Sequence, residues 1–377
     1  MKPEALTNHR IRFAAVFLTA SFLTGCVDRS ALPIDEKLNL TPVKFQNLPG
    51  WSHQKHAAAL TPFWRSCVKL LQKPRQAPFG KTQFGRVGVW QDVCQTLDHR
   101  KFKEPKYAKR FFEKMFQPYL VSNQASGKSE GIFTGYFEPE IMGARFRGGK
   151  FQTPLYSVPR DFKQLAGRYF SRRQIEAGAL KNRAQPIAWI ADPVDAFFLH
   201  IQGSGRIRLP NQKVLRVGFA GHNGHPYTAI GRVLIKQGAM EREKVSMQSI
   251  RAWLSANPRR APDIMKENAR YVFFRRLTGP GPIGAQGVAL TPGRSLAVDP
   301  KFISYGTPIW LDTKDPLTAN KPFQRLLIAQ DTGGAIKGLV RGDIFFGYGK
   351  TAAQYAGHMN RKGEYYILLP RAAAPST

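Results

Sequence analysis

The sequence predicts a mainly β protein with some helix, and a barrel rather than a parallel sheet. From Gly131 onward, apolar and polar residues alternate in runs such as GIFTGYFEPEI, and turn residues separate the runs. The chain has 34 glycines and 27 prolines, so many short strands joined by turns are expected. At 377 residues, 42% of them hydrophobic, it can bury one large core or two modest ones.

The N-terminus has the build of a bacterial lipoprotein signal peptide. Lys2, Arg10 and Arg12 precede an apolar stretch, residues 13–23, that is too short to span a bilayer as a resident helix. The stretch leads into Leu-Thr-Gly-Cys26, which is similar to a lipobox. In that class of protein the chain is cut before the cysteine, whose thiol carries lipid. The alternative is a chance cysteine at the end of an ordinary signal peptide.

Processing at this motif would remove residues 1–25 and leave an acylated Cys26. Acyl chains, and not a transmembrane helix, would then hold the protein at a membrane surface. Val27 and not aspartate follows the cysteine, which by the usual sorting rule indicates the outer membrane, facing the periplasm. Residues 26–50 are polar and contain proline, so we expect a lipidated tether.

The chain is strongly basic. Lys and Arg total 57 against 25 Asp and Glu, a formal charge of +32, which attracts polyanions in general. Nucleic acid would be the first partner to consider, but the export signal argues against it. The polyanions available to an exported protein are lipopolysaccharide, anionic lipid and the peptide carboxylates of peptidoglycan. Because the basic residues are scattered, general attraction is the better interpretation.

Helical periodicity is confined to a few segments. Aromatic residues repeat at four-residue spacing over residues 107–116 before Pro118, which predicts a helix with a buried aromatic face. Residues 227–236 and 246–256 are predicted as two further helices. Residues 284–369 are expected to form a succession of short strands.

Two cysteines remain after the lipobox, Cys67 and Cys94, each a few residues after a tryptophan in a segment typical of a short amphipathic helix. In an oxidising compartment, a disulfide that joins the two helices is one expectation, and two free buried thiols are the other. A nucleophilic cysteine is not expected, because neither lies near a cluster of histidines and asparagines.

Three aspartates carry most of the chemical information: Asp299, Asp331 and Asp343. Each lies at the end of an apolar run, beside the glycine or proline of a turn. Carboxylates at buried strand ends are costly to desolvate, and several held close together push their pKa values apart. One then stays protonated near neutral pH, as a general acid must. The alternative is that they are turn aspartates that satisfy local backbone groups.

Of the three, Asp343 is the leading candidate for the acid. It follows Arg341 and Gly342 and opens the apolar strand Ile-Phe-Phe, whereas Asp331 closes an apolar strand before a Gly-Gly turn. If those two strands are neighbours, one carboxylate raises the pKa of the other. By this reasoning alone, Asp331 is almost as good a choice.

Six blocks of sequence resemble a known family. They are FTGYFEPE, DAFFLHIQGSGR, GVALTPGRSLAVDP, YGTPIWLD, AQDTGGAIKG and RGDIFFGYG. Together they resemble the membrane-bound lytic murein transglycosylase A family, with every block in the family's order, over about residues 64–370. A single DTGG would be a weak signal, but six ordered blocks are specific.

The resemblance implies a six-stranded double-psi β-barrel in two separated pieces, with a second β-rich domain inserted between them. The glycan would lie in the groove between the two domains. The expected division is residues 51–140 for the first barrel piece with N-terminal helices, 141–274 for the inserted substrate-binding domain and 275–370 for the second barrel piece.

The resemblance also implies a reaction. A lytic transglycosylase cleaves the β-1,4 bond between MurNAc and GlcNAc and forms a 1,6-anhydromuramoyl end, without a cofactor. One carboxyl serves as acid and then as base, because the substrate's own C6 hydroxyl is the nucleophile. The resemblance assigns this role to Asp343, and Asp331 and Asp299 would then orient and shape the site.

Substrate-binding candidates come from two blocks. Gln202 and Ser204 follow an apolar run that we interpret as a strand, and lie on a Gly-rich turn where they suit sugar hydroxyl and N-acetyl groups. They could equally cap local backbone. Thr134, Tyr136 and Glu138 alternate, so they share one strand face. Tyr136 would stack on a sugar or belong to the core, and Glu138 is the best alternative acid in the first piece.

The partners implied are peptidoglycan glycan strands, outer-membrane lipid through acylated Cys26, and proteins of a wall-synthesis complex, with no nucleic acid. An aspartic protease is a rival, because LLIAQDTGG resembles its strand and turn, but that mechanism needs two such loops. The other Asp-Thr pair, at residues 312–313, is followed by lysine, so a homodimer would have to supply the second loop. A non-catalytic wall-binding or wall-loosening module is the closer rival, because function does not follow from fold.

Metal or cofactor chemistry has little support in the sequence. His53 and His56, and likewise His222 and His225, lie three apart, but no third ligand with clear spacing accompanies either pair. Solvated loop histidines are the better interpretation. The chain also has no phosphate loop and no dinucleotide fingerprint.

Overall fold

The structure is a computed structural model that describes residues 37–80, 84–162, 168–279 and 281–373. The expected signal peptide, residues 1–25, and the lipidation site Cys26 lie outside the described residues. Within the described ranges, no helix has both the length and the apolar character needed to cross a membrane.

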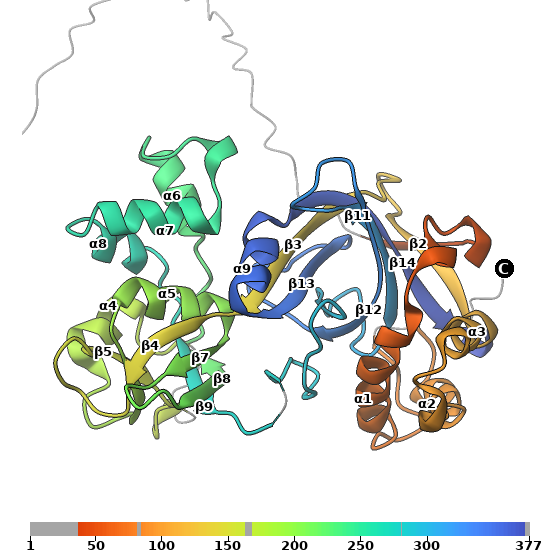
Figure 1. Cartoon of the computed structure of the whole chain (residues 1–377), viewed down its shortest axis with the longest axis horizontal. Coiled ribbons are helices and arrows are strands. Elements are labelled where there is room, and N and C mark those ends of the chain that lie inside the picture. The colour runs from red at the N-terminus through yellow and green to blue at the C-terminus, as the bar shows by residue number, and fades with distance from the viewer. Residues whose placement is uncertain (1–36, 81–83, 163–167, 280, 374–377) are drawn as a thin grey trace, which may run out of the picture. The chain divides into compact units, whose positions relative to one another are not determined.

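The larger of two sheets has eight strands in the order β1-β2-β14-β11-β12-β10-β13-β3 (Figure 1). The strands are β1 (Leu38–Pro42), β2 (Phe116–Asn123), β3 (Gly131–Glu138), β10 (Ser295–Ala297), β11 (Pro308–Lys314), β12 (Pro322–Asp331), β13 (Arg341–Tyr348) and β14 (Asn360–Pro370). Strand β14 pairs with β3 as well as with β11, so six of these strands close into a ring. Two pairings are parallel, β10 with β12 and β13 with β3.

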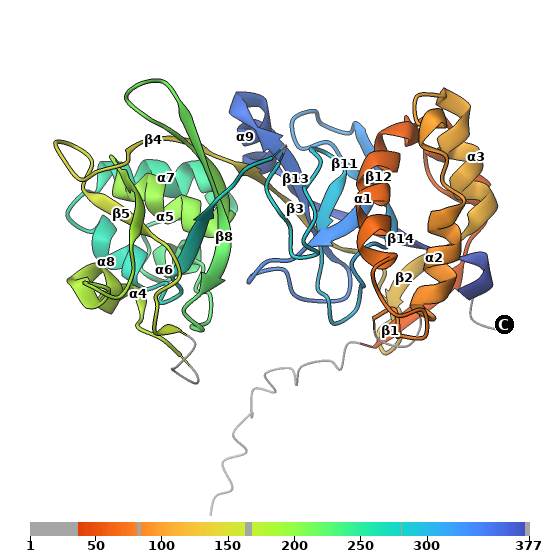
Figure 2. The same cartoon turned by 90° about the horizontal axis from the view of Figure 1, so that it is seen from below.

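Apolar burial explains why the ring forms. Strand β12 holds a continuous apolar run, residues 326–329, that is fully buried, as is typical of strands covered on both faces. Three helices pack against the same core, as both views show (Figure 2): α1 (Leu60–Leu70), α2 (Val87–Gln95) and α3 (Pro105–Met115). The helix predicted over residues 107–116 is confirmed. It ends at Met115 because Phe116 already pairs in β2.

The second sheet has six strands in the order β5-β6-β4-β7-β8-β9. They are β4 (Glu140–Ala144), β5 (Thr153–Tyr156), β6 (Pro186–Ile190), β7 (Ser204–Arg208), β8 (Val214–His222) and β9 (Val272–Arg276). The helices of this part are α4 (Arg172–Gln174), α5 (Pro193–Gln202), α6 (Ile230–Lys236), α7 (Met247–Ala256) and α8 (Ala261–Lys266). Helices α5 to α8 share one apolar core, and the sheet forms another. The two helices predicted over residues 227–236 and 246–256 are confirmed as α6 and α7, with Ser246 capping α7.

The tether expected over residues 26–50 was wrong for its second half. Strand β1 pairs antiparallel with β2, and Leu48 is only 3% exposed. The physical reason is the alternation of Leu38 and Leu40, which places both leucines against the core of the larger sheet. Residues 38–50 therefore belong to the fold.

The apolar run before Gln202 was also misinterpreted, because it is helix α5 and not a strand. The Asp192 side chain accepts a hydrogen bond from Val194 N at 2.8 Å, and Pro193 occupies the first helical turn. Gly203, with φ of 75°, ends the helix in the left-handed conformation. These caps decide between helix and strand for a run whose apolar residues fit both.

A further helix, α9 (Gly349–His358), interrupts the strands that were expected over residues 284–369. It packs on β3, where a Cβ on Gly135 would lie 2.9 Å from the Cα of Ala356. Gly135 is therefore required for the close approach of α9 to the ring.

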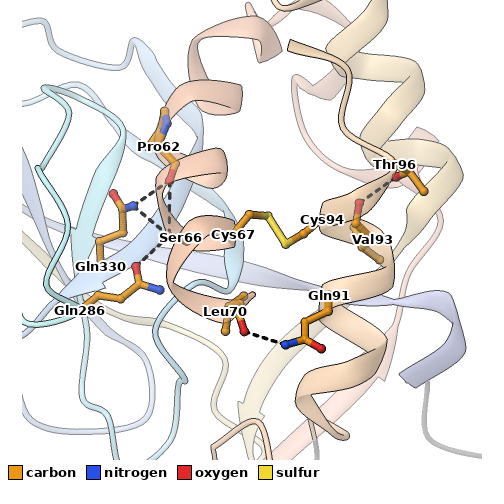
Figure 3. The surroundings of a disulfide bond; sticks show 10 residues. All are labelled: Pro62, Ser66, Cys67, Leu70, Gln91, Val93, Cys94, Thr96, Gln286 and Gln330. Atoms are coloured by element: carbon orange, nitrogen blue, oxygen red, sulfur yellow. Dashed lines mark hydrogen bonds between the residues drawn. A yellow bond between two sulfur atoms is a disulfide. The ribbon is translucent and has the colours of Figure 1, made fainter. Parts of the chain in front are cut away.

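The question left open for the two cysteines is answered in the structure by a disulfide. The Cys67–Cys94 bond joins α1 to α2 (Figure 3), and both residues are buried. The amide of Gln91 donates to Leu70 O at 2.8 Å beside it. Ser66 lies on α1 and forms hydrogen bonds with Gln286 and Gln330, which hold α1 to the ring. The disulfide therefore connects α2 to a helix that is itself anchored.

Reduction of this disulfide should destabilise the protein. The bridge spans 27 residues, so its loss should lower the free energy of unfolding by about 3 kcal/mol through the entropy of the unfolded chain. Denaturant titration with and without reductant measures the effect. Cys67→Ala/Cys94→Ala is the control, because reductant should not change its stability. Equal stability of the oxidised and reduced wild type would contradict the prediction.

Candidate active site

A cleft of about 1070 Å³ is lined by residues of both sheets. The larger sheet contributes Tyr136, Asp331 and Asp343, the second sheet contributes Ser204, and helix α5 contributes Gln202. Five of the eight predicted site residues thus share one cavity. Of the other three, Thr134 contacts Asp343, whereas Asp299 and Glu138 face other partners.

Strand β10 sets the spacing of the two carboxylates in the cleft. Ala297 pairs with Asp331 on one side and with Asp343 on the other. The strands that carry the aspartates are therefore not direct neighbours, which was the condition in the sequence argument, but lie on either side of β10. Two strand spacings place their backbones about 10 Å apart.

Asp343 is held at the end of a short hydrogen-bond chain. Thr134 is its partner across the parallel β13–β3 pairing, and Thr134 Oγ1 donates to Asp343 Oδ1 at 2.7 Å. Arg341 Nη2 donates to the same hydroxyl at 2.8 Å. No donor in the described part of the chain reaches Asp343 Oδ2. One oxygen is thus oriented by the protein, and the other is left for a ligand.

The environment of Asp343 favours its protonated form. Burial raises the pKa of this carboxyl to about 6, against the opposing effects of Arg341 and of the Thr134 hydrogen bond. The negative charge of Asp331 adds to the increase. The residue is nevertheless partly exposed, because it lines the cleft. A carboxylic acid that titrates near pH 6 and faces a cavity is suited to general-acid chemistry.

Asp331 differs from Asp343 because both of its oxygens have protein donors. Tyr136 OH donates to Oδ2 at 2.7 Å, and Ala285 N donates to Oδ1 at 2.9 Å. Burial raises the pKa of Asp331, and these hydrogen bonds oppose the increase. The phenol that was considered for sugar stacking is thus engaged with a carboxylate, and burial raises the pKa of Tyr136 well above its usual range.

Asp299 does not line the cleft. It is 3% exposed, and its two carboxylate oxygens accept from Lys301 N and Gly338 N, each at 3.0 Å. These bonds connect the end of β10 with the loop that follows Asp331. Its contacts are those of a residue that shapes a loop.

Glu138 shares a strand with Thr134 and Tyr136 but points to a different partner. Its carboxylate is 2% exposed and lies 3.2 Å from Arg216 Nη2. Burial raises the pKa of Glu138, and Arg216 opposes the increase. Glu138 is thus buried in an ion pair and is not among the residues that line the cleft, so its position does not favour it as the alternative acid.

Gln202 and Ser204 stand on either side of the glycine that ends α5. Gln202 Oε1 accepts from Phe137 N at 3.1 Å, which connects α5 with β3. Ser204 begins β7 and is buried, yet it lines the cleft. Gln202 thus has both the backbone contact and the cavity position that the sequence left as alternatives.

Several residues of the site were missed by the sequence argument. Arg341 donates to the Thr134 hydroxyl and so helps to orient it, although Arg341 is not among the residues that line the cleft. Tyr227 is close enough to Asp343 for that charge to contribute to the increase in its pKa, after burial. Arg270 Nη2 lies 2.6 Å from His222 Nε2. No periodicity marks these residues, because they come from loops and strand ends far apart in the chain.

The histidine pairs do not assemble a metal site in the described residues, where no group of three potential ligands occurs. His222 contacts Arg270, and His225 Nε2 lies 2.8 Å from Tyr169 O. His56 is buried beside Trp51 and is therefore not a solvated loop residue.

Comparison with known proteins agrees with the resemblance seen in the sequence. Residues 132–275 match the model of the MltA specific insert domain, and residues 294–369 match the 3D domain. The membrane-bound lytic murein transglycosylase A of Escherichia coli K12 is 36% identical over 244 residues, which cover 63% of this chain. The match spans 65% of that relative's length, slightly less than two thirds.

Solved structures match over more of the chain. The membrane-bound lytic murein transglycosylase of Agrobacterium tumefaciens is 30% identical with a TM-score of 0.77, covering 89% of this chain and 98% of that one. E. coli MltA with bound chitohexaose is 25% identical with a TM-score of 0.63, covering 91% and 94%. This chain therefore belongs to the membrane-bound lytic murein transglycosylase A family. Its sheet-rich fold with some helices is similar to the solved MltA structures.

Asp343→Asn should stabilise the folded protein at pH 8 but not at pH 4. Because the folded pKa of about 6 exceeds the usual aspartate value, the unfolded chain ionises first as pH rises. Wild type therefore loses stability between about pH 4 and pH 6, and the asparagine variant does not. Thermal melts across this pH range measure the difference.

Asp263→Asn is the matched control, because that side chain is 73% exposed and carries the same charge. It should show no comparable gain at pH 8. A pH-independent effect of Asp343→Asn would mean that the carboxyl is not destabilised by its surroundings.

Proposed function

We propose that this protein is a peptidoglycan lytic transglycosylase that uses Asp343 as its single acid and base. The observation that carries the proposal is the environment of this carboxyl. It faces the cleft, burial raises its pKa to about 6, and no donor among the described residues reaches its second oxygen. The names of the relatives support the same activity. One of them binds chitohexaose, which supports a glycan as the occupant of the cleft here.

The reaction would proceed in two proton transfers. Protonated Asp343 donates to the glycosidic oxygen as the bond between MurNAc C1 and that oxygen breaks. The MurNAc C6 hydroxyl then attacks C1, and its proton returns to Asp343 as the 1,6-anhydro ring closes. The acid is regenerated without water, and no cofactor is needed.

The residues around Asp343 would orient it, raise its pKa, shape the site and bind the substrate. Thr134 would orient the reacting carboxyl, and Asp331 would add to the increase in its pKa that burial causes. Asp299 would shape the loop after Asp331. Gln202 and Ser204 would bind sugar hydroxyl or N-acetyl groups from the opposite wall.

The same proposal extends to the architecture and the setting. The closed six-stranded ring would be the double-psi β-barrel, with residues 141–274 as the inserted substrate domain between pieces 51–140 and 275–370. Acylated Cys26 would anchor the protein to the outer membrane on its periplasmic side. Wall-synthesis proteins would be its protein partners.

Asp343→Asn should lower turnover of purified sacculi by at least ~10³, because asparagine cannot deliver or accept a proton. Mass spectrometry of the wild-type products should find 1,6-anhydromuramoyl ends. Asp263→Asn should retain activity, and Asp343→Asn should still bind sacculi. Reducing MurNAc ends would mean that water attacks, and binding without any turnover by the wild type would favour a wall-binding module.

Two substitutions beside Asp343 should move the pH profile in opposite directions. Activity should fall as pH rises through the Asp343 pKa of about 6, because the acid ionises. Thr134→Val removes a donor that favours the ionised form, so the alkaline limb of kcat/KM should move to higher pH. Asp331→Asn removes a repelling charge, so the limb should move to lower pH.

Shifts of the same sign in both variants would contradict this account of the site. If Asp343→Asn keeps near-normal activity while Asp331→Asn abolishes it, the assignment is inverted and Asp331 is the acid.

A further inference from the structure

Arg270 is a cation of the cleft that the proposed reaction does not use. It precedes β9 by two residues, is half-buried, and lines the same cavity as Asp331 and Asp343. Its guanidinium reaches the turn that follows Asp331, where a Cβ on Gly334 would lie 2.1 Å from Arg270 Nη1. The same Cβ would lie 3.5 Å from the Cβ of Tyr227. Burial raises the pKa of Tyr227, and the charge of Asp343 contributes to the increase. Arg270 therefore lies beside the turn that follows Asp331, in the same cleft as Asp343.

No carboxylate of the described residues forms an ion pair with this arginine. None of the ion pairs formed within the described ranges includes Arg270, whereas Arg172 and Arg216, in the same part of the chain, each pair with a glutamate. Burial lowers the pKa of Arg270, and no carboxylate contributes an opposing effect. A partly desolvated cation without a counter-charge is unfavourable unless a ligand supplies one.

The contact with His222 does not compensate the charge. His222 Nδ1 already accepts from Gly224 N at 3.0 Å, and Arg270 Nη2 lies 2.6 Å from Nε2. A neutral imidazole accepts a hydrogen bond at only one of its two nitrogens. His222 thus cannot accept hydrogen bonds from both Gly224 N and Arg270 Nη2. If it accepts from Gly224 N, it gives Arg270 no acceptor.

We propose that Arg270 binds a carboxylate of the stem peptide on the glycan and so makes the enzyme prefer peptide-bearing strands. This inference rests on the proposed function. In peptidoglycan the anions are the peptide carboxylates. Arg275 and Lys337 line the same cleft and add to its positive potential. The guanidinium offers the paired donors that a carboxylate accepts.

The test compares two forms of one substrate. The first is glycan strands with stem peptides, and the second is the same strands after an amidase has removed the peptides and the MurNAc lactyl carboxylate that this hydrolysis frees has been converted to an amide. Arg270→Gln should lower kcat/KM about tenfold on peptide-bearing strands, the effect of one lost charge-assisted hydrogen bond. On bare strands the change should be less than about twofold. Arg270→Lys keeps the charge and should recover part of the preference. Arg242→Gln, an exposed cation of the same part of the chain, is the matched control and should change neither value.

A second part of the experiment changes the substrate instead of the enzyme. Amidation of the peptide carboxylates should lower kcat/KM of the wild type about tenfold, and should add little to the loss in Arg270→Gln. This double cycle isolates the pairing even if the variant is less stable, because each enzyme is compared with itself.

The outcomes separate the two proposals. No turnover of either strand by the wild type would overturn the proposed function. Turnover of both strands with equal losses in Arg270→Gln would mean that Arg270 only supports the cleft, and would overturn this inference alone. Full additivity of amidation and Arg270→Gln would also overturn it, because the carboxylate would then bind elsewhere.

Discussion

The candidate site depends on one constraint. Strand β10 has only three residues, and it pairs with another strand along each of its two edges. Strand β10 is buried throughout and lies between β12 and β13, so Ala297 holds Asp331 on one side and Asp343 on the other. A shift of register by one residue would turn either aspartate to the opposite face. The charge interaction that helps to keep Asp343 protonated therefore depends on backbone hydrogen bonds and not on any direct contact between the two carboxyls.

The two carboxyls differ in the number of hydrogen bonds that each one accepts from the protein. Tyr136 and Ala285 occupy both oxygens of Asp331, whereas Thr134 occupies one oxygen of Asp343. Hydrogen bonds to a carboxylate favour its charged form, and burial favours the neutral form. Asp343 has fewer opposing donors, so burial has the greater effect on its pKa. Two identical side chains are thus placed in different chemical environments by their neighbours.

Sequence patterns were sufficient to predict features that depend only on residues close together in the chain. The alternation of Thr134 with Tyr136 predicted that both lie on one strand face, and in the structure each of them donates to an aspartate of the cleft. Periodicity could not show that β10 lies between the two strands, because strand order depends on distant pairing. It also could not show that Glu138 meets Arg216, 78 residues away. The apolar run before Gln202 fits helix and strand alike, so its caps had to decide.

Closure of the ring has a consequence for how the chain folds. Strand β3 pairs with β13, and Thr134 and Asp343 are 209 residues apart, while β14 at the C-terminal end pairs with β2, β11 and β3. Contacts of such sequence separation form slowly, because a long loop must be closed before they contribute. The ring cannot close until the last strand has been synthesised, so the edges of β2 and β3 stay unpaired meanwhile. A chain in that state is prone to aggregation. Folding of this protein should therefore benefit from a chaperone that shields strand edges until the C-terminus arrives.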